Sequence, residues 1–246
     1  MRAFSRNHPV LFGVLLFFAA LLAAVPFSVA GSVLAGKEAG SAVGRLIVGV
    51  VLILLFRPCF RKGRPFSGLR WILPALLFPL WNIVYHLASG MGELVPAARL
   101  PLAILLGLAP AVFEEVIFRG ILIAKLRENG KTPMAALVIS AVLFGAVHLT
   151  NLAGMPLADA LVQTGYAVVV GLVLGAVYLK SGDIAAVILA HALIDITSSL
   201  FAASPGETSA PMLLAFVLLL AVETVYAVRL TGKMPADGAE AQERSS

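Results

Sequence analysis

Residues 107–126, GLAPAVFEEVIFRGILIAKL, decide how this sequence folds. The stretch is apolar enough to cross a membrane, yet it carries Glu114, Glu115 and Arg119 in its middle. A charged side chain at the centre of a membrane helix costs roughly 2.5–3.5 kcal/mol on insertion scales, so such residues face the protein interior or a water-filled cavity. The stretch therefore predicts a membrane helix with a polar inner face.

The composition of the whole chain agrees with a membrane protein. Its 246 residues are 60% hydrophobic and only 13% charged, and the mean hydropathy is +0.99. A soluble domain has about 25% charged residues. The formal charge of +5 comes from basic residues that lie between apolar runs, which indicates membrane topology and anionic lipid rather than nucleic acid. Cys59 is the only cysteine, so no internal disulfide forms.

Eight stretches approach the length of about 20 apolar residues that a membrane-spanning helix needs. The fold class predicted is therefore all-α, a polytopic membrane protein of about eight transmembrane helices with a polar cavity. The predicted spans are Val10–Val29, Ala42–Phe56, Trp71–Ala88, Leu100–Ala124, Pro133–Leu149, Ala160–Leu179, Ile184–Phe201 and Pro211–Leu230. We expect one transmembrane domain over residues 1–235, with a catalytic core at about 100–200, and a disordered cytoplasmic tail over 236–246.

The number of lysine and arginine residues alternates between high and low from one loop to the next, and this pattern predicts the orientation in the membrane. The loop after the second span, RPCFRKGRPFSGLR, is strongly basic, and so is the loop after the fourth span. The intervening loops hold few basic residues, with Lys37 and Arg45 assigned to the first and Arg99 to the second. The positive-inside rule then places both termini in the cytoplasm. A rival interpretation makes the first span a signal peptide, cleaved after the sequence Ser28-Val29-Ala30.

The ionisable residues of the fourth span have a spacing that separates them into two faces. Glu115 and Arg119 are four residues apart, so they share a helix face and form an ion pair. Glu114 is rotated by about 100° from Glu115 and points at a different neighbour.

Two further spans carry histidine. His148 follows Phe144 by four residues in the fifth span, and His191 precedes Asp195 by four residues in the seventh. A single intramembrane histidine is commonly a packing residue, but three such helices together predict one shared polar cavity. Because the basic loops are cytoplasmic, we expect this cavity to open to the cytoplasmic half.

These segments resemble a known family. Residues 114–119 (EEVIFR), 144–148 (FGAVH) and 191–195 (HALID) are similar to the EExxxR, FxxxH and HxxxN motifs of the CAAX protease and bacteriocin-processing family of intramembrane peptidases. Their order and separation match, although Asp195 stands where the prenyl-protein proteases have Asn. The site residues that the resemblance implies are Glu114, Glu115, Arg119, His148, His191 and Asp195.

The resemblance implies hydrolysis of a peptide bond. Glu114 and His148 would orient and deprotonate a water, and His191 with the group at 195 would donate hydrogen bonds to the developing oxyanion. The alternative is a metal mechanism, in which zinc is held by Glu114, His148 and His191. The sequence has no HExxH helix, and a metal-free site is the preferred expectation.

The expected substrate is a membrane-associated or hydrophobic peptide or membrane protein, cut within the cell membrane, which we expect to be bacterial. Two other functions stay open. Intramembrane acids and histidines also serve as proton relays in ion-coupled transporters, although no inverted repeat is visible here. A non-catalytic bacteriocin-immunity or scaffold protein would bind a peptide or partner without cutting it.

Overall fold

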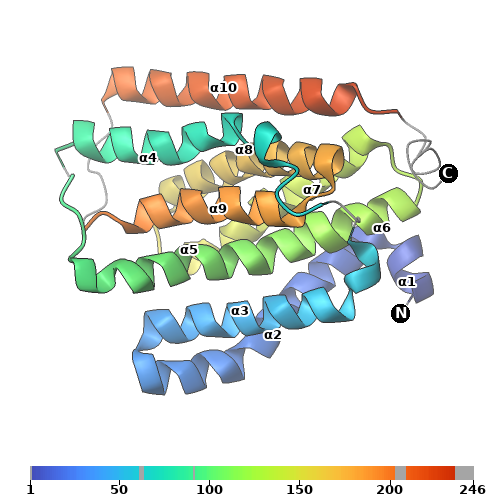
Figure 1. Ribbon diagram of the computed structural model, residues 1–246, viewed down its shortest axis with the longest axis horizontal. Helices are drawn as coiled ribbons and strands as arrows, with labels where there is room; N and C mark the ends of the chain where they lie inside the picture. The colour runs from blue at the N-terminus through green and yellow to red at the C-terminus, as the bar shows by residue number, and fades with distance from the viewer. Residues whose placement is uncertain (1, 61–63, 91, 203–208, 236–246) are drawn as a thin grey trace.

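The computed structural model describes residues 2–60, 64–90, 92–202 and 209–235, and over these the chain is a bundle of helices (Figure 1). Six of its helices are long and apolar enough to cross a membrane, and two shorter apolar helices complete the set of eight that the sequence predicts. The chain is therefore an all-α, multi-pass membrane protein. The tail predicted over 236–246 lies outside the described residues.

The α-helices follow the predicted spans closely. A short α1 (Arg2–Asn7) precedes them. The others are α2 (Pro9–Ala35), α3 (Lys37–Leu55), α4 (Leu77–Ala88), α5 (Leu100–Glu115), α6 (Ile123–Glu128), α7 (Pro133–Val147), α8 (Leu157–Ser181), α9 (Ile184–Ser199) and α10 (Ala210–Gly232). Four 3-10 turns lie in the connections before and after α4, namely η1 (Arg57–Cys59), η2 (Leu69–Trp71), η3 (Pro74–Leu76) and η4 (Ala97–Arg99).

Two spans differ from the prediction at their ends. The third was expected to begin at Trp71, but its α-helix begins at Leu77, because Pro74 opens a separate 3-10 turn instead of continuing an α-helix. The fifth leaves α-geometry after Val147 and continues as the 3-10 segment η6 (His148–Ala153). His148 therefore stands at a junction, where the helix narrows.

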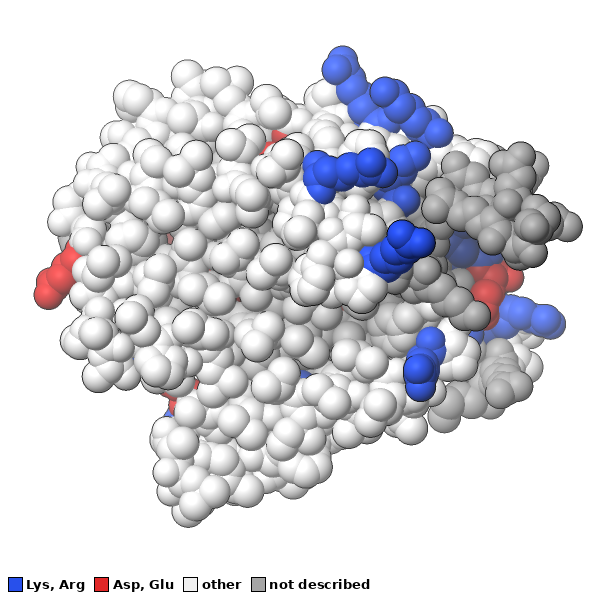
Figure 2. All heavy atoms as spheres, in the orientation of Figure 1, with Lys and Arg blue, Asp and Glu red and all other residues white. Residues whose placement is uncertain are grey.

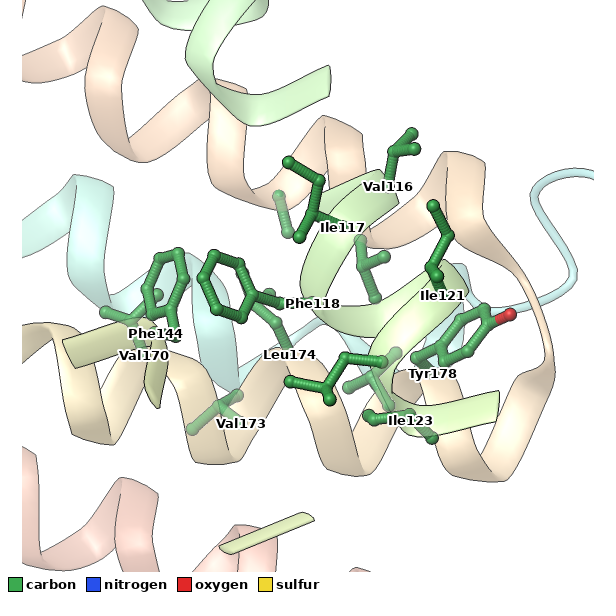
Figure 3. Close-up of a cluster of buried hydrophobic side chains, with 14 of the residues drawn as sticks. Val116, Ile117, Phe118, Ile121, Ile123, Phe144, Val170, Val173, Leu174 and Tyr178 are labelled. Carbon is green, nitrogen blue, oxygen red and sulfur yellow. The ribbon is translucent and has the colours of Figure 1, made fainter. Parts of the chain in front are cut away.

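The fourth span is one continuous helix with an irregular middle. Between α5 and α6 the chain forms a π-helical segment, η5 (Val116–Leu122), and all seven of its residues are buried. Such widened turns occur often at functional sites. Around η5 the side chains of Phe118, Phe144, Leu174 and Tyr178 pack into the apolar core (Figure 3).

The helices are arranged around α5 and α9, which pack against each other along the centre of the bundle (Figure 1). On one side the hairpin of α2 and α3 packs on α5, and on the other side α8 joins α7 to α10. The α2–α3 pair is close because small residues face each other: a Cβ at Gly44 would meet the backbone oxygen of Ala24 at 2.7 Å.

The start of α9 is anchored inside the protein. Asp183 is only 2% exposed, and its carboxylate accepts hydrogen bonds from the backbone N–H groups of Ala185 and Ala186, which caps the helix. The backbone N–H of Gly68, in the basic loop, donates to the same side chain at 2.9 Å. His191 thus lies two turns beyond a fixed helix start.

Candidate active site

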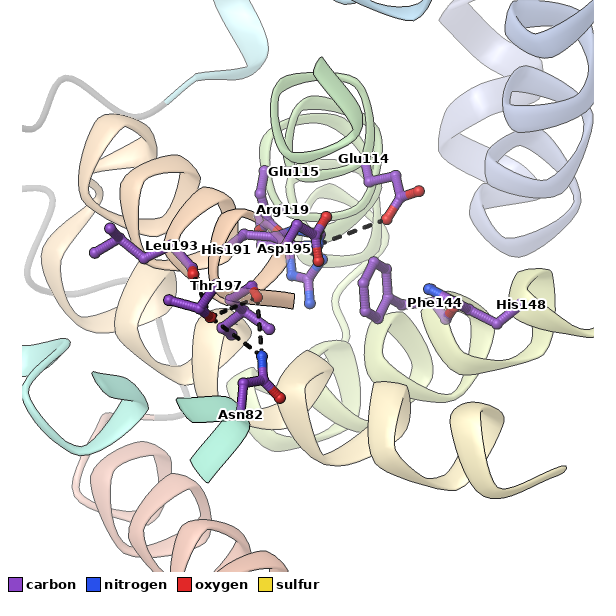
Figure 4. A network of polar contacts seen from close by, with 11 residues as sticks. Asn82, Glu114, Glu115, Arg119, Phe144, His148, His191, Leu193, Asp195 and Thr197 are labelled. Atoms are coloured by element: carbon purple, nitrogen blue, oxygen red, sulfur yellow. Dashed lines mark hydrogen bonds and ion pairs between the residues drawn. The ribbon is translucent and has the colours of Figure 1, made fainter. Parts of the chain in front are cut away.

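Glu115 is the buried centre of the site. Its Oε1 accepts a hydrogen bond from Nη1 of Arg119 at 2.8 Å and lies 2.8 Å from Nδ1 of His191 (Figure 4). All of these side chains are at most 6% exposed. The predicted ion pair within the helix is thus present, and it also binds α9 to the fourth span.

The Arg119 guanidinium lies over an aromatic ring. Its central carbon is 4.2 Å from the ring centroid of Phe144, which contributes a cation–π contact. Nε and Nη2 of Arg119 have no hydrogen-bond partner among the described residues. Glu115 is consequently the only described carboxylate that hydrogen-bonds this buried cation.

The other nitrogen of His191 faces two acids. Because a carboxylate can only accept, Nδ1–H of His191 donates to Glu115, and Nε2 is left toward Glu114 and Asp195. Nε2 lies 3.9 Å from Oε2 of Glu114 and 3.6 Å from Oδ2 of Asp195. An imidazole flanked in this way is suited to carry a proton at Nε2 and to donate it in a hydrogen bond.

His148 is oriented by its own helix. Its Nδ1 lies 2.8 Å from the backbone oxygen of Phe144, which can only accept, so Nδ1 carries the hydrogen and Nε2 is the free nitrogen. The ring also packs edge-on against Phe144, with centroids 5.0 Å apart. Phe144 therefore lies between the two histidines, against His148 on one side and His191 on the other (Figure 4).

Four of the six predicted site residues share one cavity of about 230 Å³. Glu115 and Arg119 lie behind its wall, fully buried. The cavity is lined by Phe17, Leu21, Arg45, Pro110, Phe113, Glu114, Val147, His148, Thr150, Asn151, Gln163, His191 and Asp195.

Four polar lining residues were not predicted, namely Arg45, Thr150, Asn151 and Gln163. Arg45 was assigned to a loop, but it lies within α3 and faces the cavity, and its presence inside a predicted span was the signal that pointed inward. Asn151 donates to Gln163 at 2.8 Å, and this pair ties η6 to α8 beside the cavity. Neither amide belongs to the three motifs, so only the fold brings them to the site.

The cavity does not lie wholly beside the basic loops, near which we expected it, because Asn151 and Gln163 lie toward the other end of the bundle. The reason is that α7 begins at Pro133 and carries His148 15 residues along the chain (from 133 to 148), while Glu114 is 14 residues from the end of α6 (from 114 to 128). The two side chains consequently reach the same depth.

A neighbouring helix fixes the segment of α9 that carries Asp195. The side-chain amide of Asn82 donates to the backbone oxygen of Ile194 at 3.0 Å and to the hydroxyl of Thr197 at 3.2 Å. Asn82 therefore joins α4 to α9 through hydrogen bonds between the helices.

The proposed zinc ligands do not form a metal site as they stand. Within the described part of the chain, no three His, Cys, Asp or Glu side chains are grouped closely enough to hold a metal ion. Phe144 separates His148 from His191. The donors thus do not fit a zinc ion in this conformation, and no step proposed below passes through one.

Comparison with known proteins supports the three motifs. Residues 95–197 match the family model described as Type II CAAX prenyl endopeptidase Rce1-like. No curated protein and no solved structure matches the chain. The matched segment runs from η4 to α9 and contains all six predicted site residues. Over residues 95–197 the chain is therefore similar to the Type II CAAX prenyl endopeptidase Rce1-like family of proteases.

Proposed function

We propose that this protein is an intramembrane endopeptidase in which Glu114 and His148 activate a water that attacks a peptide carbonyl. The observation that carries the proposal is the single cavity of about 230 Å³, which Glu114, His148, His191 and Asp195 all line. Pockets for drug-sized ligands run to roughly 300–1,000 Å³, so this one suits a short peptide segment around one scissile bond.

The bond-breaking steps balance with these groups. Water adds to the carbonyl carbon as its proton passes to the Glu114 carboxylate or to Nε2 of His148. The carbonyl oxygen becomes negative and accepts the hydrogen at Nε2 of His191. The tetrahedral intermediate then collapses, the C–N bond breaks, and the proton held by the base moves to the leaving nitrogen. The products are one new carboxylate and one new amine.

Asp195 takes a supporting role in this scheme. Its Oδ2, 3.6 Å from Nε2 of His191, favours the imidazolium form, in which Nε2 carries hydrogen while Nδ1–H donates to Glu115. An asparagine oxygen at the same place would accept the same hydrogen bond. The departure from the family motif therefore leaves the proposed oxyanion donor in place.

The decisive experiment compares membranes that carry the parent protein with membranes that carry Glu114→Gln. Removal of a general base lowers the rate by about 10²–10⁴-fold, so peptides that the parent cleaves should accumulate uncut and be identified by mass spectrometry. Glu128→Gln is the matched control, because Glu128 lies on the same helix in an exposed pair with Lys125. Its peptide profile should equal that of the parent.

Two results would contradict the proposal. Identical peptide profiles for the parent and Glu114→Gln would remove the evidence for proteolysis, and full biological activity in a Glu114→Ala, His148→Ala double variant would favour a binding protein. Metal analysis of the purified, active protein tests the mechanism separately. We expect activity without stoichiometric zinc, and zinc that is lost together with activity would overturn the metal-free scheme.

A further inference from the structure

The two ends of the bundle differ sharply in charge. One end gathers most of the described lysines and arginines, and Figure 2 shows them around α6 and the chain termini. These residues include Arg57, Arg64, Arg70, Lys125, Lys131 and Arg229. Near the other end the described residues Lys37 and Arg99 are balanced by Glu38, Glu93 and Asp159. By the positive-inside rule the first, basic end faces the cytoplasm.

Some of the cavity residues lie closer to the second end, whereas Glu114 and His191 lie near the middle of their helices. Asp195 is four residues from the end of α9 at Ser199, and Gln163 is six residues from the start of α8 at Leu157. At 1.5 Å per residue these are depths of about 6 and 9 Å from the weakly charged end. The same two residues lie about 17 and 27 Å from the basic ends of their helices.

Toward the basic end the cavity is closed by packed side chains. Glu115, Arg119 and all seven residues of η5 are buried, and Phe118 packs edge-on against Phe144 with centroids 5.4 Å apart. Beyond them Asp183 is buried under the backbone of Gly68. No described residue of a basic loop lines the cavity.

Toward the weakly charged end the lining is polar and accessible. Thr150 is exposed, Arg45 and Gln163 are partly exposed, and all three belong to the cavity wall. Arg45 and Asp195 line the same cavity, and no carboxylate among the described residues forms an ion pair with Arg45. A polar rim of this kind is suited to admit water and to hold peptide backbone.

We propose that the catalytic cavity opens on the side of the membrane opposite the basic loops. Its substrate, if the proposed function holds, is then a peptide or membrane-protein segment that enters from the outer half of the bilayer. Arg45, Thr150 and the Asn151–Gln163 pair form the entrance. A cytoplasmic peptide would have to pass the packed layer around Phe118 to reach Glu114.

The test is the accessibility of single cysteines and requires no substrate. Cys59 is the single cysteine of the sequence, and burial raises the pKa of its thiol, so it would react slowly with the label. It is removed by Cys59→Ser, and each reporter is introduced into that variant. Three reporters are introduced singly: Thr150→Cys at the entrance, Glu93→Cys at the weakly charged end and Lys131→Cys at the basic end. All three positions are exposed. A membrane-impermeant maleimide is applied to right-side-out and to inverted membrane vesicles.

We expect the maleimide to label Thr150→Cys and Glu93→Cys in right-side-out vesicles, and Lys131→Cys in inverted vesicles only. Labelling of Thr150→Cys only in inverted vesicles would overturn the proposal. So would a Thr150→Cys that is labelled in detergent but in neither type of vesicle, because the entrance would then face lipid alone. The labelling is repeated in the Glu114→Gln variant, and the peptide profile of that variant tests the proposed function separately. If the labelling pattern is as expected but no uncut peptides accumulate, the proposed function is refuted and the entrance stays assigned.

Discussion

At the residue scale, one carboxylate oxygen connects two helices. Oε1 of Glu115 is 2.8 Å from both Nη1 of Arg119 and Nδ1 of His191. Removing one partner of a buried charge pair strands the other in an apolar interior, which costs far more than the pair contributes when intact. The site and the stability of the bundle therefore depend on the same atom.

Replacing Arg119 with methionine should destabilise the protein strongly. The loss leaves Glu115 charged and without its main partner, so the expected loss in unfolding free energy is about 3–5 kcal/mol. Thermal unfolding in detergent, followed by circular dichroism, measures the change in Tm. The control is Arg99→Met, since Arg99 pairs with Glu38 at 3.4 Å on the surface and such pairs contribute about 0–1 kcal/mol. Equal Tm shifts in the two variants would contradict the prediction.

The sequence could predict contacts within a helix but not between helices. The Glu115–Arg119 pair follows from four-residue spacing, as does the proximity of His191 to Asp195. The contact from Glu115 to His191 joins residues 76 positions apart, and no spacing rule reports it. The same holds for Arg45, whose place in the cavity depends on how α3 packs against α5.

At the scale of elements, a glycine sets the distance between the two central helices. A Cβ at Gly107 of α5 would lie 2.7 Å from the backbone nitrogen of Ile196 and 2.8 Å from the oxygen of Ala192, both on α9. Backbone atoms cannot move aside as a flexible side chain can. The close α5–α9 contact is thus built on this position, and it holds His191 against Glu115.

Gly107→Ala should consequently lower activity. The methyl group pushes α9 away from α5 and lengthens the His191–Glu115 contact, and misplacing a catalytic group by about 1 Å costs on the order of 100-fold. The peptides that accumulate in Glu114→Gln membranes supply the cleavage assay. Gly165→Ala is the control, because nothing lies within 4 Å of a Cβ there. Activity of Gly107→Ala equal to that of Gly165→Ala would argue against this role of the contact.

Hydropathy located the helices but not their irregularities. All eight apolar helices lie within the predicted spans or extend them by a few residues. The π segment η5 and the 3-10 segment η6 were not predicted, because a hydropathy pattern reports burial and carries no information on whether a turn closes over three, four or five residues.

At the scale of the whole molecule, eight apolar helices and the uneven charge lead to one orientation. An even number of crossings returns the chain to its starting side, and the basic residues cluster at the end of the bundle where α1 lies and α10 ends (Figures 1 and 2). Whether the six long helices alone cross the membrane or α4 and α9 cross it as well, the number of crossings is even. In both cases the two ends of the described chain lie on the same side.

Reporter fusions should place both termini in the cytoplasm. Green fluorescent protein fused at either end is expected to fluoresce, and alkaline phosphatase at the same positions to be inactive. The intact mass of the purified protein tests the rival signal-peptide interpretation, which requires a chain that begins at Gly31. Phosphatase activity at the C-terminus would reverse the orientation, and with it the side to which the cavity is assigned.

The π turn also limits which changes of length this chain can tolerate. A π turn closes over five residues where an α turn closes over four, so η5 holds one residue more than a regular helix would need. That surplus residue brings two faces into phase: Glu114 of α5 points at the cavity while α6 keeps its apolar side in the core. A deletion of one residue here would rotate one half against the other by about 100°. Loops can absorb insertions and deletions. The same changes in η5 would turn Glu114 and Glu115 away from both histidines.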